Sequence, residues 1–254
     1  MCEPDSSRQK TPMTPDSIAA YERPARVASY DADMDMMHPN RHKMVEIALE
    51  ILPFDPQSTI TALDLGTGTG FFTQRFLERF PRATVISVDG SKSMVELART
   101  RLVFLTARVD FRIGDFRQLH DMIPETECGE VVFSSYALHH LNRKEKVEVF
   151  RQALRFLKPE GWLINADIVR SESKVIEERF QQVRVDGIVR RGRAVDPRFR
   201  DSVATRQFLD ELEATDQDQP LPVEQDLQVL RDAGFTHVSV FWSEYREVVI
   251  GGRK

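Results

Sequence analysis

The sequence predicts an α/β fold in which helices cover both faces of a mostly parallel sheet. Short apolar runs of strand length alternate with segments whose apolar residues recur at helical spacing. Glycines, serines or carboxylates directly follow several of these runs, as expected where parallel strands end at a ligand crevice. The length of 254 residues and the hydrophobic content of 41% suit one domain, residues 18–254, better than two.

Residues 1–17 are polar and contain three prolines. Such a composition buries too little apolar surface to order itself, so we expect a disordered tail. The tail has no apolar core, and no uncharged apolar run in the chain is long enough to span a bilayer, so we expect a cytoplasmic protein without membrane segments. Cys2 and Cys128 are far apart in sequence, and a structural disulfide is not expected.

A first helix is predicted over residues 41–52, where apolar side chains have helical spacing and Pro53 and Pro56 follow. His38 and His42 would share a face if this helix began early, and two histidines four residues apart can ligate a metal. No glutamate or third ligand accompanies them as in a metalloprotease motif, so we predict no metal site.

The predicted strand over residues 61–65 leads directly into a turn with three glycines. Gly66 and Gly68 let the backbone approach a ligand because they carry no Cβ, and Gly70 lets the following helix pack against its strand. This turn can hold a nucleotide-like ligand, although a purely structural turn has the same letters. The apolar face of the next helix, residues 71–80, belongs to the core.

Two further predicted strands end in carboxylates. Asp89 completes a strand that begins at residue 83, and it is placed to accept hydrogen bonds from both hydroxyls of a ribose. Asp115 and Phe116 follow the strand over residues 109–113, where they offer a carboxylate to an exocyclic amine and a ring to an adenine. A helix cap or a solvated turn would explain either acid alone.

The fourth predicted strand, residues 131–133, runs into a polar stretch that ends in two histidines. His139 and His140 are candidate general bases, because histidine titrates near neutral pH, and the alternative is that one of them braces the next helix. That helix is capped by Asn142 and ends near residue 159, and the fifth strand covers residues 162–167. Tyr136 and Asp167, at the ends of these two strands, are candidate pocket residues.

Residues 171–216 interrupt the alternation with two predicted helices, joined by the basic, glycine-containing loop 189–193. A last helix over residues 223–233 ends at Gly234. Two strands, residues 238–242 and 247–250, close the chain as a hairpin.

The pattern D-x-G-x-G-x-G at residues 64–70, with Asp89 after the second strand and Asp115 after the third, resembles the motifs of class I S-adenosylmethionine (SAM) methyltransferases. A nicotinamide dehydrogenase has the fingerprint G-x-G-x-x-G, which differs from the spacing here. The resemblance covers about residues 40–170 well and the last thirty residues moderately. It implies a Rossmann-like, seven-stranded, mostly parallel sheet with one antiparallel strand, and SAM as cofactor.

The resemblance also implies roles for individual residues. Met94 would lie against the adenine, or belong only to the core, and two serines after the fourth strand would lie near the methionine part of SAM. The catalytic candidates are His139, His140 and Tyr136. The predicted cofactor-binding residues are Asp64, Gly66, Thr67, Gly68, Asp89, Gly90, Met94, Gly114, Asp115, Phe116, Ser134 and Ser135.

Two segments around the motifs each have two interpretations. Residues 17–41 are either a lid over the SAM site, as is common in small-molecule methyltransferases, or an irregular lead-in whose methionines fill core gaps. The insertion at 171–216 either covers the substrate or presents a solvated basic loop.

We expect a methyltransferase that acts on a small molecule. The alternatives are a tRNA-modifying or carboxy-SAM-type enzyme, since the chain resembles a group related to tRNA uridine-5-oxyacetic acid methyltransferase and carboxy-SAM synthase, and a SAM-binding partner protein without catalysis. A net charge of −5 provides no global positive field, which makes a nucleic-acid substrate the weaker alternative. No oligomeric state is predicted.

Overall fold

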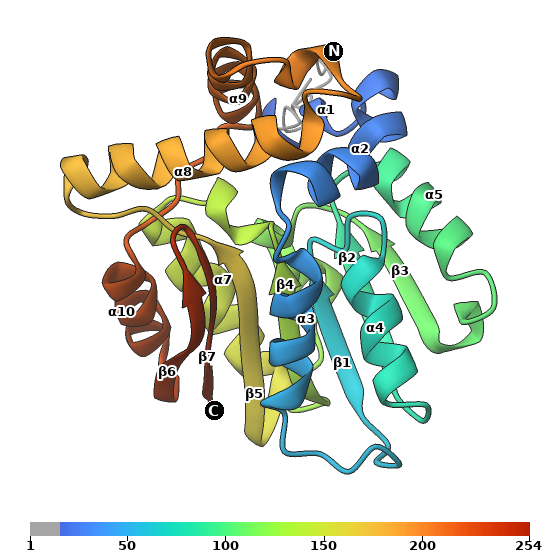
Figure 1. The fold of residues 1–254 in the computed structure, drawn as a ribbon. Coiled ribbons are helices and arrows are strands. Elements are labelled where there is room, and N and C mark those ends of the chain that lie inside the picture. Colours follow the sequence, from blue (N-terminus) through green and yellow to red (C-terminus); the bar gives the residue numbers. More distant parts are fainter. Residues whose placement is uncertain (1–15) are drawn as a thin grey trace, which may run out of the picture.

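A computed structural model describes residues 16–254, which are arranged around a seven-stranded sheet (Figure 1). The strands are β1 (Thr61–Leu65), β2 (Thr84–Asp89), β3 (Val109–Ile113), β4 (Gly129–Ser135), β5 (Leu157–Ile168), β6 (Thr236–Glu244) and β7 (Glu247–Arg253). Their order is β3-β2-β1-β4-β5-β7-β6. Within it β7 runs antiparallel to both neighbours, while the pairs from β3 to β5 are parallel. The predicted fold class is confirmed.

Helices pack on both faces of this sheet and above one edge (Figure 1). The α-helices are α1 (Asp16–Ala20), α2 (Pro24–Met37), α3 (Arg41–Glu50), α4 (Phe71–Arg79), α5 (Lys92–Arg101), α6 (Leu119–Met122), α7 (Arg143–Phe156), α8 (Lys174–Gly192), α9 (Ser202–Asp216) and α10 (Val223–Ala233). Short 3-10 helices are η1 (Thr106–Arg108), η2 (Phe116–Gln118), η3 (Leu138–His140) and η4 (Pro197–Phe199). No helix among residues 16–254 is long and apolar enough to cross a membrane.

The apolar side chains form three clusters that follow this layering. The first cluster lies between the sheet and α3, α4 and α5, and contains Met44, Phe72, Phe76 and Met94. The second lies on the opposite face under α6, α7 and α10. A third, smaller cluster joins Met37 of α2 to α8, η4 and α9. This third cluster holds the N-terminal helices and the insertion together above the carboxyl ends of the strands (Figure 1).

The predicted caps at Asn142 and Gly234 are present, and Ser91 provides a further one. The hydroxyl of Ser91 accepts from the Met94 amide, and Asn142 and Glu145 form a reciprocal capping box at the start of α7. Gly234 ends α10 in a left-handed conformation with φ of 110°. The two N-caps at Ser91 and Asn142 fix where α5 and α7 begin.

Some boundaries differ from the prediction. Residues 1–15 of the expected tail lie outside the described residues, and its last two residues begin α1. The segment between Ser17 and Arg41 is helical rather than irregular. The expected basic loop 189–193 belongs mainly to α8, because packing of Gly192 on Phe199 outweighs the low helix propensity of glycine. β5 begins at Leu157, with a register irregularity before residue 162.

Candidate functional site

A cavity of about 640 Å³, counting its open mouth, lies at the carboxyl ends of β1, β2 and β4. It is called the first cavity below. The strand order reverses between β1 and β4, and such a switch point is where open α/β sheets bind ligands. The predicted cofactor-binding residues that line it are Gly66, Gly68, Asp89, Gly90, Met94, Asp115 and Phe116.

The glycine turn forms one wall of the first cavity. Gly66 and Gly68 have φ of 76° and 52°, a region that side chains rarely adopt. A Cβ at Gly66 would collide with Ala137, whereas the nearest atom to a Cβ at Gly68 would be the Tyr30 hydroxyl at 3.9 Å. Gly68 therefore faces open space, as a close approach to a ligand requires. Gly70, predicted to let the next helix pack against the sheet, faces Ala98 of α5 and Leu102, while Phe72 of α4 packs on Phe133 of β4.

Asp89 lies on the floor of the first cavity. Its carboxylate accepts from the Gly68 amide at 2.7 Å and from the Ser91 amide at 2.8 Å, one bond to each oxygen. Burial raises the pKa of Asp89 to about 6, although these two amides favour the charged form. Each oxygen retains a lone pair for a further donor. The carboxylate thus has the chemistry needed to hold the two hydroxyls of a ribose.

The end of β3 contributes both a cap and a cavity wall. Asp115 accepts from the Arg117 amide at 2.9 Å and pairs with the Arg117 guanidinium at 2.7 Å, so the capping alternative holds while the residue still lines the first cavity. Phe116 lines it beside Asp115. Gly114 packs against Met122 and does not line the first cavity.

A smaller cavity adjoins the first and shares Gly66, Gly68, Tyr30 and Tyr136 with it. Three further residues that were predicted to bind the cofactor also line this smaller cavity: Asp64, Thr67 and Ser135. Both Thr67 and Thr73 donate hydroxyl hydrogen bonds to Asp64, at 2.8 and 2.5 Å, and burial raises the pKa of Asp64 to about 7. Ser134 instead donates to the Leu65 carbonyl at 2.7 Å and ties β4 to β1.

The N-terminal helices cover the first cavity with side chains that sequence reasoning did not assign to the site. Ile18, Tyr21 and Tyr30 line it from α1, the following turn and α2. The methionines of α2 do fill the core, because Met34 and Met37 are buried. The segment thus lies where a lid would lie and also contributes to packing. In the sequence, the tyrosines of this segment were the one feature that pointed to a contact with a ligand.

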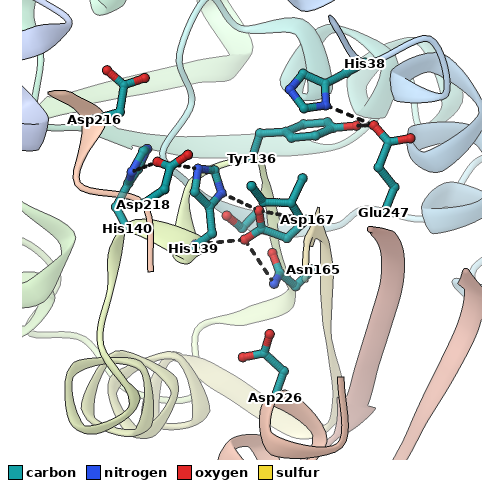
Figure 2. A network of polar contacts seen from close by, with 12 residues as sticks. His38, Tyr136, His139, His140, Asn165, Asp167, Asp216, Asp218, Asp226 and Glu247 are labelled. Atoms are coloured by element: carbon teal, nitrogen blue, oxygen red, sulfur yellow. Dashed lines mark hydrogen bonds and ion pairs between the residues drawn. The ribbon is translucent and has the colours of Figure 1, made fainter. Parts of the chain in front are cut away.

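His139 is held between two carboxylates (Figure 2). Its Nδ1 lies 2.6 Å from Asp167, and its Nε2 lies 3.4 Å from Asp218. Burial would lower the pKa of His139, but the two negative charges outweigh it and raise the pKa to about 10. The ring is therefore an imidazolium at neutral pH. An imidazolium has no lone pair with which to remove a proton, so this geometry argues against His139 as a base.

His140 lines the first cavity, and its two nitrogens face different neighbours, although Nδ1 forms no hydrogen bond among the described residues. Nδ1 lies 3.1 Å from Asp218, and Nε2 lies 3.3 Å from the Tyr21 hydroxyl. One ligand atom each from His139, His140 and Asp218 lie within 4.8 Å of one another, a grouping that could hold a metal ion and that the sequence did not predict. A metal there would have to displace the proton that the two aspartates keep on His139.

Tyr136 separates the first cavity from a second one. Its backbone has φ of 49°, and its hydroxyl donates to Glu247 at 2.8 Å. Glu247 also lies 3.0 Å from Nδ1 of His38 (Figure 2). His38 and Glu247 line the second cavity, which encloses about 860 Å³ including its opening and is roofed by α8. His38 ends α2 and His42 lies on α3, so the two do not share a helix face.

Comparison with known proteins agrees with this geometry. A family model described as a methyltransferase domain matches residues 62–161. A malonyl-[acyl-carrier protein] O-methyltransferase of Halalkalibacterium halodurans is 29% identical over 53% of this chain and 49% of its own. The corresponding protein of Bacillus cereus is 24% identical over 67% of this chain and 60% of its own. The chain thus spans less than two thirds of the length of these relatives.

Solved structures share the fold at lower identity. An O-methyltransferase family protein from Burkholderia thailandensis superposes with a TM-score of 0.62 at 20% identity, covering 92% of this chain and 63% of that one. A phosphoethanolamine N-methyltransferase 2 of Haemonchus contortus in complex with SAM gives a TM-score of 0.62 at 18% identity, covering 88% and 45%. Taken with the match from β1 into β5 and the placement of Asp89 beside the glycine turn, these likenesses lead to one conclusion: residues 62–161 form a methyltransferase domain of the class I, SAM-dependent kind.

Proposed function

We propose that this protein transfers a methyl group from SAM, held in the first cavity, to a small molecule held in the second cavity. The observation that carries this proposal is a hydrogen bond between a lining residue of the first cavity and one of the second. Tyr136 lines the first cavity, and its hydroxyl bonds to Glu247, which lines the second. A cofactor and an acceptor in these cavities would lie on either side of Tyr136, and transfer requires this side chain to leave room for the reacting atoms to touch.

Residues of the first cavity fit the nucleoside part of SAM. Asp89 offers its carboxylate to the ribose, Met94 and Phe116 offer apolar surface to the base, and Gly68 leaves room for close approach. Bound SAM supplies a methyl group on a positively charged sulfur. The chain must then hold both ligands in line and exclude water, and the cover formed by Tyr21 and Tyr30 suits that role.

The second cavity suits a small acceptor with an apolar body. Apolar side chains alternate there with charged ones at the rim, where Arg190 makes no ion pair within the described residues. The apolar residues that line it include Met37, Ile168, Phe180 and Val183.

Labelled SAM tests the function directly. Wild-type protein is incubated with methyl-labelled SAM and fractionated cell extract, and mass spectrometry locates the label. We expect it in small metabolites. Label confined to RNA or protein would overturn the small-molecule assignment, and SAM binding without any product would indicate a non-catalytic protein.

A variant of α8 tests where the acceptor binds. Gly187 lines the second cavity, and the nearest atoms to a Cβ there belong to the guanidinium of Arg191, which donates to the Met36 carbonyl. Gly187→Leu should bind S-adenosylhomocysteine as the wild type does but lose methyl transfer. Gly187→Ala is the matched control and should keep it. Equal turnover in all three proteins would place the acceptor elsewhere.

A further inference from the structure

His38 lines the second cavity and was weighed above only as one of a possible pair of metal ligands. It caps the carboxyl end of α2, and only 11% of its side chain is exposed. Its ring lies 4.6 Å from the ring of Tyr136, measured between centroids. The imidazole thus stands at the border between the second cavity and the side chain that lines the first.

Glu247, the first residue of β7, orients this imidazole. Its carboxylate receives hydrogen bonds from Tyr136 at 2.8 Å and from Asn40 at 2.9 Å, and it lies 3.0 Å from Nδ1 of His38. Burial would raise the pKa of Glu247, but these donors outweigh it and keep the pKa below its ordinary value. An ionised carboxylate can only accept, so Nδ1 of His38 carries the proton. Nε2 is then left with a lone pair.

The charged surroundings of His38 differ from those of His139. Burial lowers the pKa of His38, and the charges of Arg184 on α8 and His139 on η3 lower it further, while Glu247 on β7 opposes them. His139 faces two carboxylates, whereas His38 faces one. The same fold therefore holds one histidine charged and the other neutral at physiological pH. Among the described residues, none forms a hydrogen bond with Nε2 of His38.

We propose that His38, positioned by Glu247, is the general base of the site and that the second cavity takes a hydroxyl acceptor. This inference rests on the proposed function. In the balanced step the acceptor oxygen forms a bond to the methyl carbon as the carbon–sulfur bond breaks, its electron pair stays on sulfur, and the hydroxyl proton passes to Nε2 of His38. Glu247 then faces an imidazolium, which its negative charge stabilises.

The reactivity of the ring can be tested without an acceptor. Diethylpyrocarbonate modifies unprotonated imidazole, and trypsin releases His38 in the peptide 27–41, which contains no other histidine. We expect modification of this peptide at about pH 7, and the rate should fall as pH drops. Exposed His42, on the next tryptic peptide, reports reagent activity. A His38 peptide that stays unmodified while His42 reacts fully would overturn the proposal.

Turnover provides the second test, with a panel of phenols and aliphatic hydroxy acids as acceptors and methyl-labelled SAM. His38→Gln should bind S-adenosylhomocysteine normally and lose about 10² to 10⁴ in turnover, together with the acid limb of the pH profile. Glu247→Gln should retain the acid limb but shift it to lower pH, because the carboxylate of Glu247 raises the pKa of His38 and the amide does not. His42→Gln is the matched control and should retain wild-type turnover.

The outcomes separate this inference from the proposed function. Turnover in His38→Gln within about threefold of wild type would exclude His38 as the base, whatever the acceptor. If His38→Gln does not fold, or if no hydroxyl compound of the panel is methylated, the modification experiment on the wild-type protein decides. Failure of the wild type to bind S-adenosylhomocysteine would instead refute the proposed function. The modification experiment on His38 needs no cofactor, so its result is independent of that outcome.

Discussion

At the scale of single residues, the environment of each acid and histidine determines what it can do. Asp89 accepts hydrogen bonds from two backbone amides and keeps lone pairs for a ligand. Asp167 instead bonds to the ring of His139 and to two backbone amides. Both were predicted as site residues from their position at strand ends. Position alone does not distinguish a ligand-binding carboxylate from one that holds a neighbouring side chain.

Asp89 should make SAM binding dependent on pH. Its pKa of about 6 in the free protein means that the carboxylate is protonated below that value, and ribose hydroxyls bind the charged form more strongly. We expect S-adenosylhomocysteine affinity to fall as pH drops through about 6. Asp89→Asn should cost roughly 1.5 to 3 kcal/mol at neutral pH and abolish this pH dependence.

Isothermal calorimetry between acid and neutral pH measures both effects on Asp89. Asp115→Asn serves as a comparison, because Asp115 lines the same cavity but is already paired with Arg117. An unchanged affinity in Asp89→Asn at every pH would remove Asp89 from the ribose site.

His139 should stabilise the fold in a pH-dependent way. Its pKa rises from the ordinary 6.5 to about 10 on folding, so its contribution is fully present below 6.5 and is lost as pH rises through about 10. His139→Gln leaves Asp167 and Asp218 without their cation, which should cost roughly 3–5 kcal/mol near neutral or weakly acidic pH. The difference from wild type should shrink as pH approaches about 10.

Urea denaturation at several pH values would measure the effect of His139→Gln. His120→Gln is the control, because the His120 side chain is 56% exposed. A destabilisation that stays constant from weakly acidic to strongly basic pH would show that the charge on His139 does not contribute.

At the scale of elements, α8 contains two glycines that differ in the space available for a side chain. A Cβ at Gly192 would collide with Phe199 in the third apolar cluster, whereas at Gly187 it would meet only the guanidinium of Arg191. We expect Gly192→Ala to lower the free energy of unfolding by about 1–3 kcal/mol. Gly187→Ala should leave it unchanged or raise it by up to about 1 kcal/mol, because alanine favours helix.

Chemical denaturation of the two α8 variants side by side gives the comparison. The two variants make the same chemical change, but Gly187 lies inside α8 and Gly192 is its last residue, so the gain in helix propensity is larger at Gly187. If Gly192→Ala were as stable as Gly187→Ala, the docking of α8 on η4 would be looser than the contact with Phe199 indicates.

At the scale of the whole molecule, the sequence predicted those features that depend on local signals. The glycine turn and the cap at Asn142 each depend on neighbouring residues, and both are present. The seven-stranded sheet was expected from the resemblance to methyltransferases, and it is present as well. The contact of His38 with Glu247 joins residues 209 positions apart, and no local pattern encodes it. The same holds for Asp218, which reaches the histidines from the segment after α9.

The helices of the insertion and the N-terminus illustrate the same limit. α8 extends through an expected loop because of packing against η4 and α9, and α2 carries no strong apolar stripe of its own. Arg26 and Tyr21 both bind Asp216 at the end of α9, which ties the two segments above the first cavity. Only the folded chain brings these partners together.

The single tyrosine between the two cavities links them thermodynamically. A ligand that moves the ring of Tyr136 also changes its hydrogen bond to Glu247, and with it the proton affinity of His38. Linkage is reciprocal, so protonation of His38 must alter cofactor affinity by the same factor. We expect S-adenosylhomocysteine to shift the NMR titration of His38 in the wild type but not in Tyr136→Phe. An equal shift in both proteins would mean that the coupling does not pass through the Tyr136 hydroxyl. A shift in the wild type alone would show that a ligand in the first cavity changes the pKa of a histidine in the second.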